Sequence, residues 1–374
     1  MIHYCTRCLL PATKPDLWVN AEGVCSACLN FDARAAVDWK DRKRQLLEQL
    51  ELFKNPSGYD CIVPVSGGKD SHYQVIKMLE FGMRPLCVTA TTDDLSEIGR
   101  KNIENLKHLG VDYLEVSTNP VVRRRINRLA LERVGDISWP EHVTIFTIPI
   151  RIAAQMGVPL ICWGEDPQNE YGGPKGTGDF QYLDNRWLQE FGGLLGLRVS
   201  DLLEEGFTEK DLIQYRYPPA EDLEKLQMRS FFLGYYLPWD GRENASVAKN
   251  HGFTWNEDVV EGSSVAYENL DNHQTGIHDF FKFLKFGFSR ATDITSMWIR
   301  RGYMSRDDAL RIVKARDGKF PWTYLGKPIA DILAPLGMSM NEFIGVCEKF
   351  TNWDLFKNKE VTHLEKVNYD NESL

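Results

Sequence analysis

The chain has 374 residues, which is long for one compact domain and favours two or three. Its hydrophobic fraction of 43% and charged fraction of 26% are typical of globular proteins and exclude disordered, collagen-like and coiled-coil chains. The net charge of −9 argues against a protein that coats nucleic acid or an anionic membrane.

The sequence predicts no membrane or secretion segment. The longest uncharged stretch, residues 152–164, is shorter than the roughly 20 residues that a membrane-spanning helix needs. Residues 1–10 lack a basic region followed by an apolar core, so no signal peptide is expected. We therefore expect a cytoplasmic protein.

The first predicted element is a metal-binding segment. Four of the eight cysteines form two CxxC half-sites with 16 residues between them, at Cys5, Cys8, Cys25 and Cys28. In a cytosolic chain this spacing predicts a zinc ribbon, in which four thiolates hold one structural Zn²⁺ and leave no position for a substrate. The alternative is two redox-active CxxC pairs. The other cysteines stand in apolar contexts and are expected in the core: Cys61, Cys87, Cys162 and Cys347.

Next, strand and helix patterns alternate. A charged amphipathic helix is predicted over residues 30–53. Short apolar runs predict four strands, at 59–65, 85–91, 113–116 and 159–163. The helical patterns between them predict an α/β fold, a doubly wound, mainly parallel sheet with helices on both faces. Beyond about residue 180 the pattern is mainly helical, with no clear strand alternation.

These patterns divide the chain into four segments. They are a zinc-binding ribbon over 1–30, a linking helix over 31–58, an α/β domain over 59–180 and a mainly helical substrate or partner region over 181–374. Parallel sheets bind ligands at the carboxyl ends of their strands. Ligand contacts are therefore expected in three loops, at 66–71, 90–96 and 164–178.

A Ser-Gly-Gly turn follows the first strand, in the run Ser66, Gly67, Gly68, Lys69, Asp70 and Ser71. Such a turn brings backbone N–H groups and a helix N-terminus to one point, which binds phosphate without needing a cation. The carboxylate of Asp70 beside phosphates indicates a bridging Mg²⁺ and makes this residue a catalytic candidate. The spacing is not that of a Walker A loop. The alternative is an ordinary glycine turn after a buried strand.

The run from Ser66 to Ser71 resembles the SGGxDS signature of the PP-loop ATP pyrophosphatases. The resemblance implies a Rossmann-like PP-loop domain over residues 59–180. It also implies that the loop holds the pyrophosphate of ATP while the α-phosphate adenylates a substrate oxygen, with Thr89 and Gly164 as further nucleotide contacts. Sulfurtransferases, synthetases and tRNA-modifying enzymes share this motif, so the motif alone leaves the substrate open.

Longer stretches are similar to one branch, the N-acetyl sugar amidotransferases of bacterial surface-polysaccharide and O-antigen synthesis. The CxxC pairs belong to that pattern, and the other similar segments are 163–174, 232–236, 239–240, 267–271 and 274–293. The resemblance implies that ATP and ammonia convert an acetamido group of a nucleotide-linked sugar into an acetamidino group, through an adenylated imidate. Family members often carry Thr where this chain has His72, which leaves the phosphate-binding residues intact.

The loop after the fourth strand carries further candidate residues. Glu165 and Asp166 are candidates for binding Mg²⁺ or the ribose, or for removing a proton from ammonia; the alternative is loop solvation or helix capping. Residues 164–178 contain five glycines and are expected to shape or close the pocket around a water-sensitive intermediate. Glu170 and Tyr171, within a stretch similar to the family, are substrate candidates.

One C-terminal helix carries two stripes. An apolar stripe with i, i+3, i+4, i+7 spacing predicts core positions at Ile277, Phe280, Phe281 and Leu284. A polar stripe of His278, Lys282 and Lys285 leads to Arg290 and could hold the diphosphate or carboxylate of a nucleotide-linked sugar; the alternative is a solvated face. The three arginines at 123–125 are expected on an exposed helix face.

The source of ammonia is expected outside the chain. No cysteine stands in a nucleophile elbow, and residue 2 is Ile, so we predict no glutaminase here. The family resemblance implies a partner glutaminase with a barrel-type protein. The main alternative function is a PP-loop tRNA-modifying enzyme for thiolation or lysidine-type ligation, which the negative net charge disfavours. A zinc-ribbon scaffold with a degenerate nucleotide site is a third interpretation, which the intact loop disfavours.

Overall fold

The protein is built around one parallel sheet. The computed structural model describes residues 2–165 and 195–367. Five strands pair in the order β3-β2-β1-β4-β5, all parallel. Their bounds are β1 Cys61–Pro64, β2 Pro85–Ala90, β3 Asp112–Val116, β4 Leu160–Trp163 and β5 Arg229–Phe232. The chain order reverses between β1 and β4, and in such sheets ligands bind outside the carboxyl ends of the strands at this point.

Helices cover both faces of the sheet. Side chains alternate along β1, so that Cys61 and Val63 join the core of one face and Ile62 joins the core of the other. The first face is covered by α2 Trp39–Glu51, α3 Lys69–Glu80, α4 Glu97–Lys107 and α11 Gly241–Asn250. The second face is covered by α6 Trp139–Met156 and α9 Ala220–Lys225. The predicted doubly wound α/β class is therefore confirmed.

One expectation about the sheet is wrong. Strands were not expected beyond about residue 180, yet β5 pairs with β4 along its whole length and forms an edge of the sheet. The four-residue strand gave no clear alternation because its last three residues, Ser230 to Phe232, are all buried. Short strands buried on both faces lack the period of two that marks an exposed strand. The predicted segment bounds at 30, 58 and 180 stay predictions.

The predicted helix over residues 30–53 is also interrupted. The structure has α1 Ser26–Ala33, a short 3₁₀ turn at Arg34–Ala36, and α2. The break falls at Asp38, whose carboxylate accepts hydrogen bonds from the backbone N–H groups of Lys40 and Asp41. An aspartate in this position favours a helix start over helix continuation, and the charge pattern alone did not reveal it.

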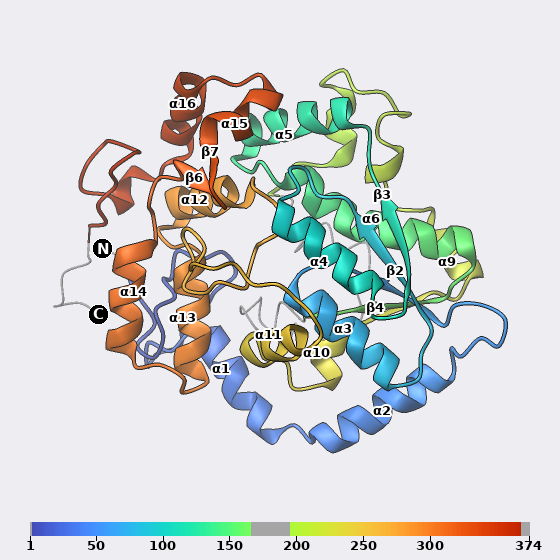
Figure 1. Ribbon diagram of the computed structural model, residues 1–374. Coiled ribbons are helices and arrows are strands. Elements are labelled where there is room, and N and C mark those ends of the chain that lie inside the picture. The colour runs from blue at the N-terminus through green and yellow to red at the C-terminus, as the bar shows by residue number, and fades with distance from the viewer. Residues whose placement is uncertain (1, 166–194, 368–374) are drawn as a thin grey trace.

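The chain after β5 is mainly helical, as predicted. Its helices are α10 Leu233–Tyr236, α11, α12 Thr275–Phe286, α13 Arg290–Arg300, α14 Arg306–Arg316, α15 Ile329–Leu333 and α16 Met340–Phe350. A small ribbon joins β6 Thr323–Tyr324 to β7 Lys327–Pro328. Figure 1 shows α12 to α16 gathered on one side of the molecule and the sheet on the other. Among the described helices, no single one is long and apolar enough to cross a membrane; only a pair bent by 93°, Ile329–Leu336 with Met340–Phe350, reaches that length and composition.

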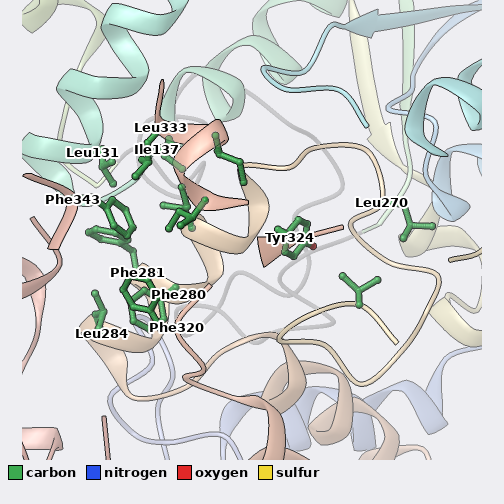
Figure 2. Packing of buried hydrophobic residues seen from close by; sticks show 14 of the residues in the cluster. Leu131, Ile137, Leu270, Phe280, Phe281, Leu284, Phe320, Tyr324, Leu333 and Phe343 are labelled. Atoms are coloured by element: carbon green, nitrogen blue, oxygen red, sulfur yellow. The ribbon is translucent and has the colours of Figure 1, made fainter. Parts of the chain in front are cut away.

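The apolar stripe of α12 forms the centre of the C-terminal core. Its four predicted members are 0–3% exposed, which confirms the prediction. Figure 2 shows the rings of Phe280, Phe281, Phe320 and Phe343 close together in this core. The same core includes Leu131, which lies in α5 Pro120–Val134 beside the sheet. One continuous core therefore fixes α12 relative to the α/β part of the protein.

The N-terminal segment packs on the C-terminal helices. Its four cysteines share a buried cluster with Phe286 at the end of α12, with Phe288 just after it, and with Ile299 of α13. The guanidinium of Arg306 in α14 donates hydrogen bonds to the carbonyl oxygens of two of these cysteines, at 3.3 and 3.4 Å. Figure 1 shows this segment beside α13 and α14. The cysteine segment is thus part of the C-terminal side of the molecule.

Candidate functional site

The loop at residues 66–71 connects β1 to α3 at the carboxyl edge of the sheet. Gly67 has φ +92, and a Cβ there would lie 2.8 Å from Cγ1 of Ile103, so this position needs glycine. Ser71 Oγ accepts a hydrogen bond from the backbone N–H of Ser66 at 3.0 Å, which closes the turn. Gly68 is the N-cap of α3, and no side chain caps this helix. The first-turn N–H groups of α3 therefore remain available to an anion.

A cavity of about 250 Å³ opens beside the loop. Besides loop residues and Glu165, its wall consists of side chains from distant parts of the chain, namely Phe253, Tyr267, Glu268, Asn269, Leu270, Asp271 and Arg290. Four of the lining residues are carboxylic acids and two are basic. Because phosphates are also negative, a triphosphate in this cavity needs a divalent cation, and carboxylate oxygens are suitable ligands for Mg²⁺. The donor set thus fits Mg²⁺.

Lys69 and Asp70 occupy fixed positions in this cavity. The ammonium of Lys69 contacts the carboxylate of Asp70 and lies 3.1 Å from Oε1 of Glu268. Burial alone lowers the pKa of Lys69, but these two carboxylates outweigh it, and the pKa is raised. Asn244 of α11 donates a hydrogen bond to Oδ1 of Asp70 at 2.9 Å. Lys69 is therefore charged and held at the phosphate loop before any ligand binds.

His72 supports the loop from behind. Its Nδ1 lies 2.9 Å from the carbonyl oxygen of Gly68, and its Nε2 lies 3.0 Å from the side-chain nitrogen of Asn105. A neutral ring with its proton on Nδ1 satisfies both contacts, because it donates to the carbonyl and accepts from the amide. Burial lowers the pKa of His72 to about 4, in agreement with a neutral ring.

Two further predicted nucleotide contacts lie near the cavity without lining it. The hydroxyl of Thr89 is buried, donates to the carbonyl oxygen of Val65 and lies 2.5 Å from the hydroxyl of Tyr113. Its polar group is thus used within the sheet. Gly164 follows β4, and a Cβ there would lie 3.0 Å from Oε1 of Gln74, so only glycine fits without a shift.

The structure tests only part of the loop after β4. Glu165 lines the cavity, as expected of a candidate catalytic residue. Asp166, Glu170 and Tyr171 lie outside the described residues, as does most of the segment 164–178 that is expected to shape or close the pocket. Their predicted roles stay predictions.

The basic stripe on α12 was interpreted either as a contact to a nucleotide-linked sugar or as a solvated face, and the structure shows a third arrangement. His278, Lys282 and Lys285 are half-buried and do not line the cavity, and each contacts an acid or a carbonyl of this chain. Nδ1 of His278 lies 2.8 Å from Asp136, Lys282 pairs with Asp293, and Lys285 donates to the carbonyls of Val134 and Gly135 at 3.3 and 3.1 Å. Arg290 alone among the four residues lines the cavity, and it donates to both carboxylate oxygens of Asp279 at 3.2 Å.

The expectation that residues 123–125 form an exposed face is wrong for one member. Arg123 is 5% exposed, pairs with Asp93 and donates to the carbonyl oxygen of Pro140 at 3.0 Å. The other two arginines are exposed as predicted. A second cavity, of about 280 Å³, lies beside Arg123 at the ends of β2 and β3.

The four N-terminal cysteines form a cluster suited to one Zn²⁺. All four are 0% exposed, and their sulfur atoms lie within 4.8 Å of one another. The Cys5–Cys28 and Cys8–Cys25 sulfur distances are 3.9 and 3.7 Å. A tetrahedral Zn²⁺ with Zn–S bonds of about 2.3 Å requires sulfur separations of roughly 3.8 Å. The backbone N–H of Cys25 points at the sulfur of Cys5 at 3.3 Å, a contact that stabilises a thiolate.

Sequence reasoning gave no role to two acids that line the cavity or to the asparagine that holds Asp70. Glu268 and Asp271 stand in the segment 267–271, which was noted only for its similarity to a family, and Asn244 gave no signal at all. Burial raises the pKa of Asp271. A short run with two acids, which begins at Tyr267, was the available signal for the first two.

The fold and the loop define an α/β protein with an anion-binding helix start at the switch point of its sheet. Residues 261–368 match the family model described as "LPS biosynthesis protein WbpG-like, C-terminal domain". This match covers the C-terminal region and agrees with the resemblance to surface-polysaccharide enzymes that the motifs indicated. Arg290 and the whole of α12 lie within the matched residues.

Other comparisons add little. Among solved structures, the NMN synthetase from Francisella tularensis is similar to 54% of this chain and 93% of its own, with 14% sequence identity and a TM-score of 0.28. No curated protein matches the chain.

Proposed function

We propose that the protein is an ATP-dependent amidotransferase of lipopolysaccharide or O-antigen sugar synthesis. It converts an acetamido group of a nucleotide-linked sugar into an acetamidino group and releases AMP and pyrophosphate. One observation carries the proposal: the SGGKDS loop and Arg290, a residue of the segment that matches the lipopolysaccharide family, line the same cavity. This shared cavity supports a site at which a nucleotide and a sugar substrate meet.

The first step activates the amide. The acetamido oxygen attacks the α-phosphorus of ATP, a new O–P bond forms, and the bond from the α-phosphorus to the bridging oxygen breaks to release pyrophosphate. The free N–H groups at the start of α3 and the ammonium of Lys69 stabilise the charge that develops on pyrophosphate. Mg²⁺, when bound by Asp70 with Glu165 or Glu268, supplies further charge neutralisation between the phosphates.

The second step replaces AMP by ammonia. Ammonia adds to the imidate carbon, AMP leaves with the former acetamido oxygen, and a proton must go to a base. Glu165 and Asp271 line the cavity, and burial raises the pKa of Asp271, which makes a carboxylate a better proton acceptor. Asp166 remains a candidate from the sequence. Arg290, held by Asp279, faces the same space and is suited to a phosphate or carboxylate of the sugar nucleotide.

Ammonia is supplied, in this proposal, by a separate glutaminase with a barrel-type protein. All four cysteines outside the CxxC pairs are 0% exposed, which leaves them unsuited to glutamine hydrolysis. The same burial disfavours the alternative of tRNA thiolation, because no exposed cysteine is present to carry sulfur. The purified chain is expected to use ammonium and not glutamine. Equal use of both would contradict this part of the proposal.

An oxygen-transfer experiment tests the reaction. A panel of nucleotide-linked sugars is prepared with ¹⁸O in the acetamido carbonyl and incubated with ATP, Mg²⁺ and ammonium. The adenylated imidate requires the label to appear in AMP, as a mass increase of that product. AMP without label, formed together with amidine, would show that the amide oxygen is not adenylated. Asp70→Asn is the inactive reference.

A further inference from the structure

We propose that Asp136, His142 and His278 form a second metal site, which takes one divalent transition-metal ion. Asp136 lies in the turn between α5 and α6, His142 in the first turn of α6, and His278 in the first turn of α12. These residues belong neither to the cysteine cluster nor to the cavity at the phosphate loop. We refer to them as the His₂Asp cluster.

The three side chains converge on one point. One ligand atom from each lies within 4.8 Å of the other two. Nδ1 of His278 is 2.8 Å from Oδ1 of Asp136, and Nδ1 of His142 is 3.3 Å from Oδ2. Around a tetrahedral ion with bonds of about 2.0–2.1 Å, ligand atoms are separated by roughly 3.4 Å. The second distance already fits, and the first needs only a small opening.

The cluster is built around a buried carboxylate. Asp136 is 2% exposed, and a buried carboxylate requires a charged or hydrogen-bonded partner. Oδ1 of Asp136 accepts a hydrogen bond from the backbone N–H of Ser138 at 2.9 Å and lies 2.8 Å from Nδ1 of His278. Nδ1 of His142 is buried, lies 3.3 Å from Oδ2 and has no hydrogen-bond partner. Lys285 is close by, but its ammonium donates to the carbonyls of Val134 and Gly135. An ion between the three ligands would give Nδ1 of His142 a partner and would replace the close contact between His278 and Asp136.

The donor set indicates the kind of ion. Two imidazoles and one carboxylate suit Zn²⁺, Fe²⁺, Co²⁺ or Mn²⁺ better than Mg²⁺ or Ca²⁺, which prefer oxygen ligands. Three protein ligands leave at least one coordination position open. The imidazoles are 27% and 26% exposed, so water or an oxygen of a substrate can reach that position. The site is therefore of the open kind, unlike the closed cysteine cluster.

The His₂Asp cluster joins two elements that shape the cavity. His278 precedes Asp279, which holds Arg290 at the cavity wall. His142 follows Glu141, whose carboxylate accepts a hydrogen bond at 2.7 Å from Asn272, the neighbour of the cavity residue Asp271. Metal binding would therefore fix α6 relative to α12.

Metal content tests the proposal. The untagged full-length protein is incubated with excess Zn²⁺, separated from free metal, and analysed for zinc per chain. We expect two equivalents in the wild type and one in His278→Ala or His142→Ala. His363→Ala is the matched control and should keep two equivalents. His363 lies 3.3 Å from Glu360 at the surface, and among the described residues the two belong to no group of three ligands. A single equivalent in the wild type would overturn the proposal.

Cobalt substitution separates the two sites. Co²⁺ bound to thiolates gives an intense near-ultraviolet charge-transfer band, whereas Co²⁺ on nitrogen and oxygen gives only weak visible bands. In His278→Ala the thiolate band should remain unchanged while the visible component from the second site disappears. If the variant spectrum equals the wild-type spectrum, no ion occupies the cluster. Should His278→Ala fail to fold, His142→Ala decides the matter, with thermal unfolding as the check on folding.

Discussion

The loop at 66–71 and the basic stripe of α12 carry the same kind of chemistry, but the structure uses them differently. Both are sets of donors that suit phosphate. In the loop, the start of α3 is uncapped and faces a cavity. On α12, the chain itself supplies the acceptors, since His278, Lys282 and Lys285 all contact acids or carbonyls of the protein. The presence of cationic residues at helical spacing therefore does not identify a ligand site.

The two regions differ because one depends on local structure and the other on tertiary structure. A Ser-Gly-Gly turn between a strand and a helix presents backbone donors wherever it occurs. The stripe of α12 predicts only which side chains share a face. What that face meets is decided by residues far away in the sequence, such as Asp136 and Val134. Spacing alone therefore could not distinguish ligand contacts from internal pairs.

Zinc removal gives the largest expected effect. It tests whether the cysteine cluster, which packs against the end of α12, stabilises the fold. Cys25→Ser is expected to lose the metal and to lower the free energy of unfolding by about 5 kcal/mol or more, because structural zinc contributes directly to folding. Urea unfolding and zinc analysis measure the two quantities. Cys347→Ala, in the C-terminal core, should keep its zinc. Full stability of a zinc-free Cys25→Ser would contradict the assignment.

The second prediction concerns the loop. Asp70→Asn should lower the turnover of ATP by a factor on the order of 10²–10³, because it removes a charge beside the phosphates while keeping the size of the side chain. Its unfolding curve should stay close to that of the wild type. Glu80→Gln, at the exposed end of the same helix, is the matched control and should retain full turnover. If Asp70→Asn kept wild-type turnover, the loop at 66–71 would not be a ligand site and would not differ from the basic stripe of α12 in this respect.

The third prediction concerns the stripe. Lys282→Ala removes the partner of Asp293, whose side chain is 2% exposed, and should lower the free energy of unfolding by about 2–3 kcal/mol. KM for the sugar nucleotide should not change. Lys319→Ala, at an exposed position, controls for loss of charge. A raised KM at unchanged stability would place Lys282 among the substrate contacts instead.

The smallest effect is a pH dependence from His72. The pKa of its ring is about 4 in the folded protein and 6.5 ordinarily, so the unfolded chain binds more protons between these values. Stability should therefore fall as pH falls from 6.5 to 4, with a loss of about 2 kcal/mol between pH 7.5 and 5. His72→Thr should lack this share of the loss. Urea midpoints of the wild type and of His72→Thr are measured at pH 7.5 and at pH 5. The gap between the two midpoints should change between these pH values, and an unchanged gap would refute the assignment.

Much of the fold was predictable because it is encoded locally. Apolar runs located β1 to β4, and the turn with Gly67 located the loop. The edge strand β5 was missed because its last three residues are all buried and show no period of two. In the site, Glu268 and Asn244 reach the loop only through tertiary packing, which no local pattern encodes. The partners of α12 were unpredictable for the same reason.

The fate of the α-phosphate tests the central claim most directly. ATP labelled in the α-phosphate is incubated with the protein, Mg²⁺, ammonium and nucleotide-linked N-acetyl sugars, and the labelled product is identified. If the loop holds the two outer phosphates as the leaving group, all label appears in AMP, together with unlabelled pyrophosphate, and only when a sugar acceptor is present. Label in ADP, with orthophosphate as the second product, would contradict the account.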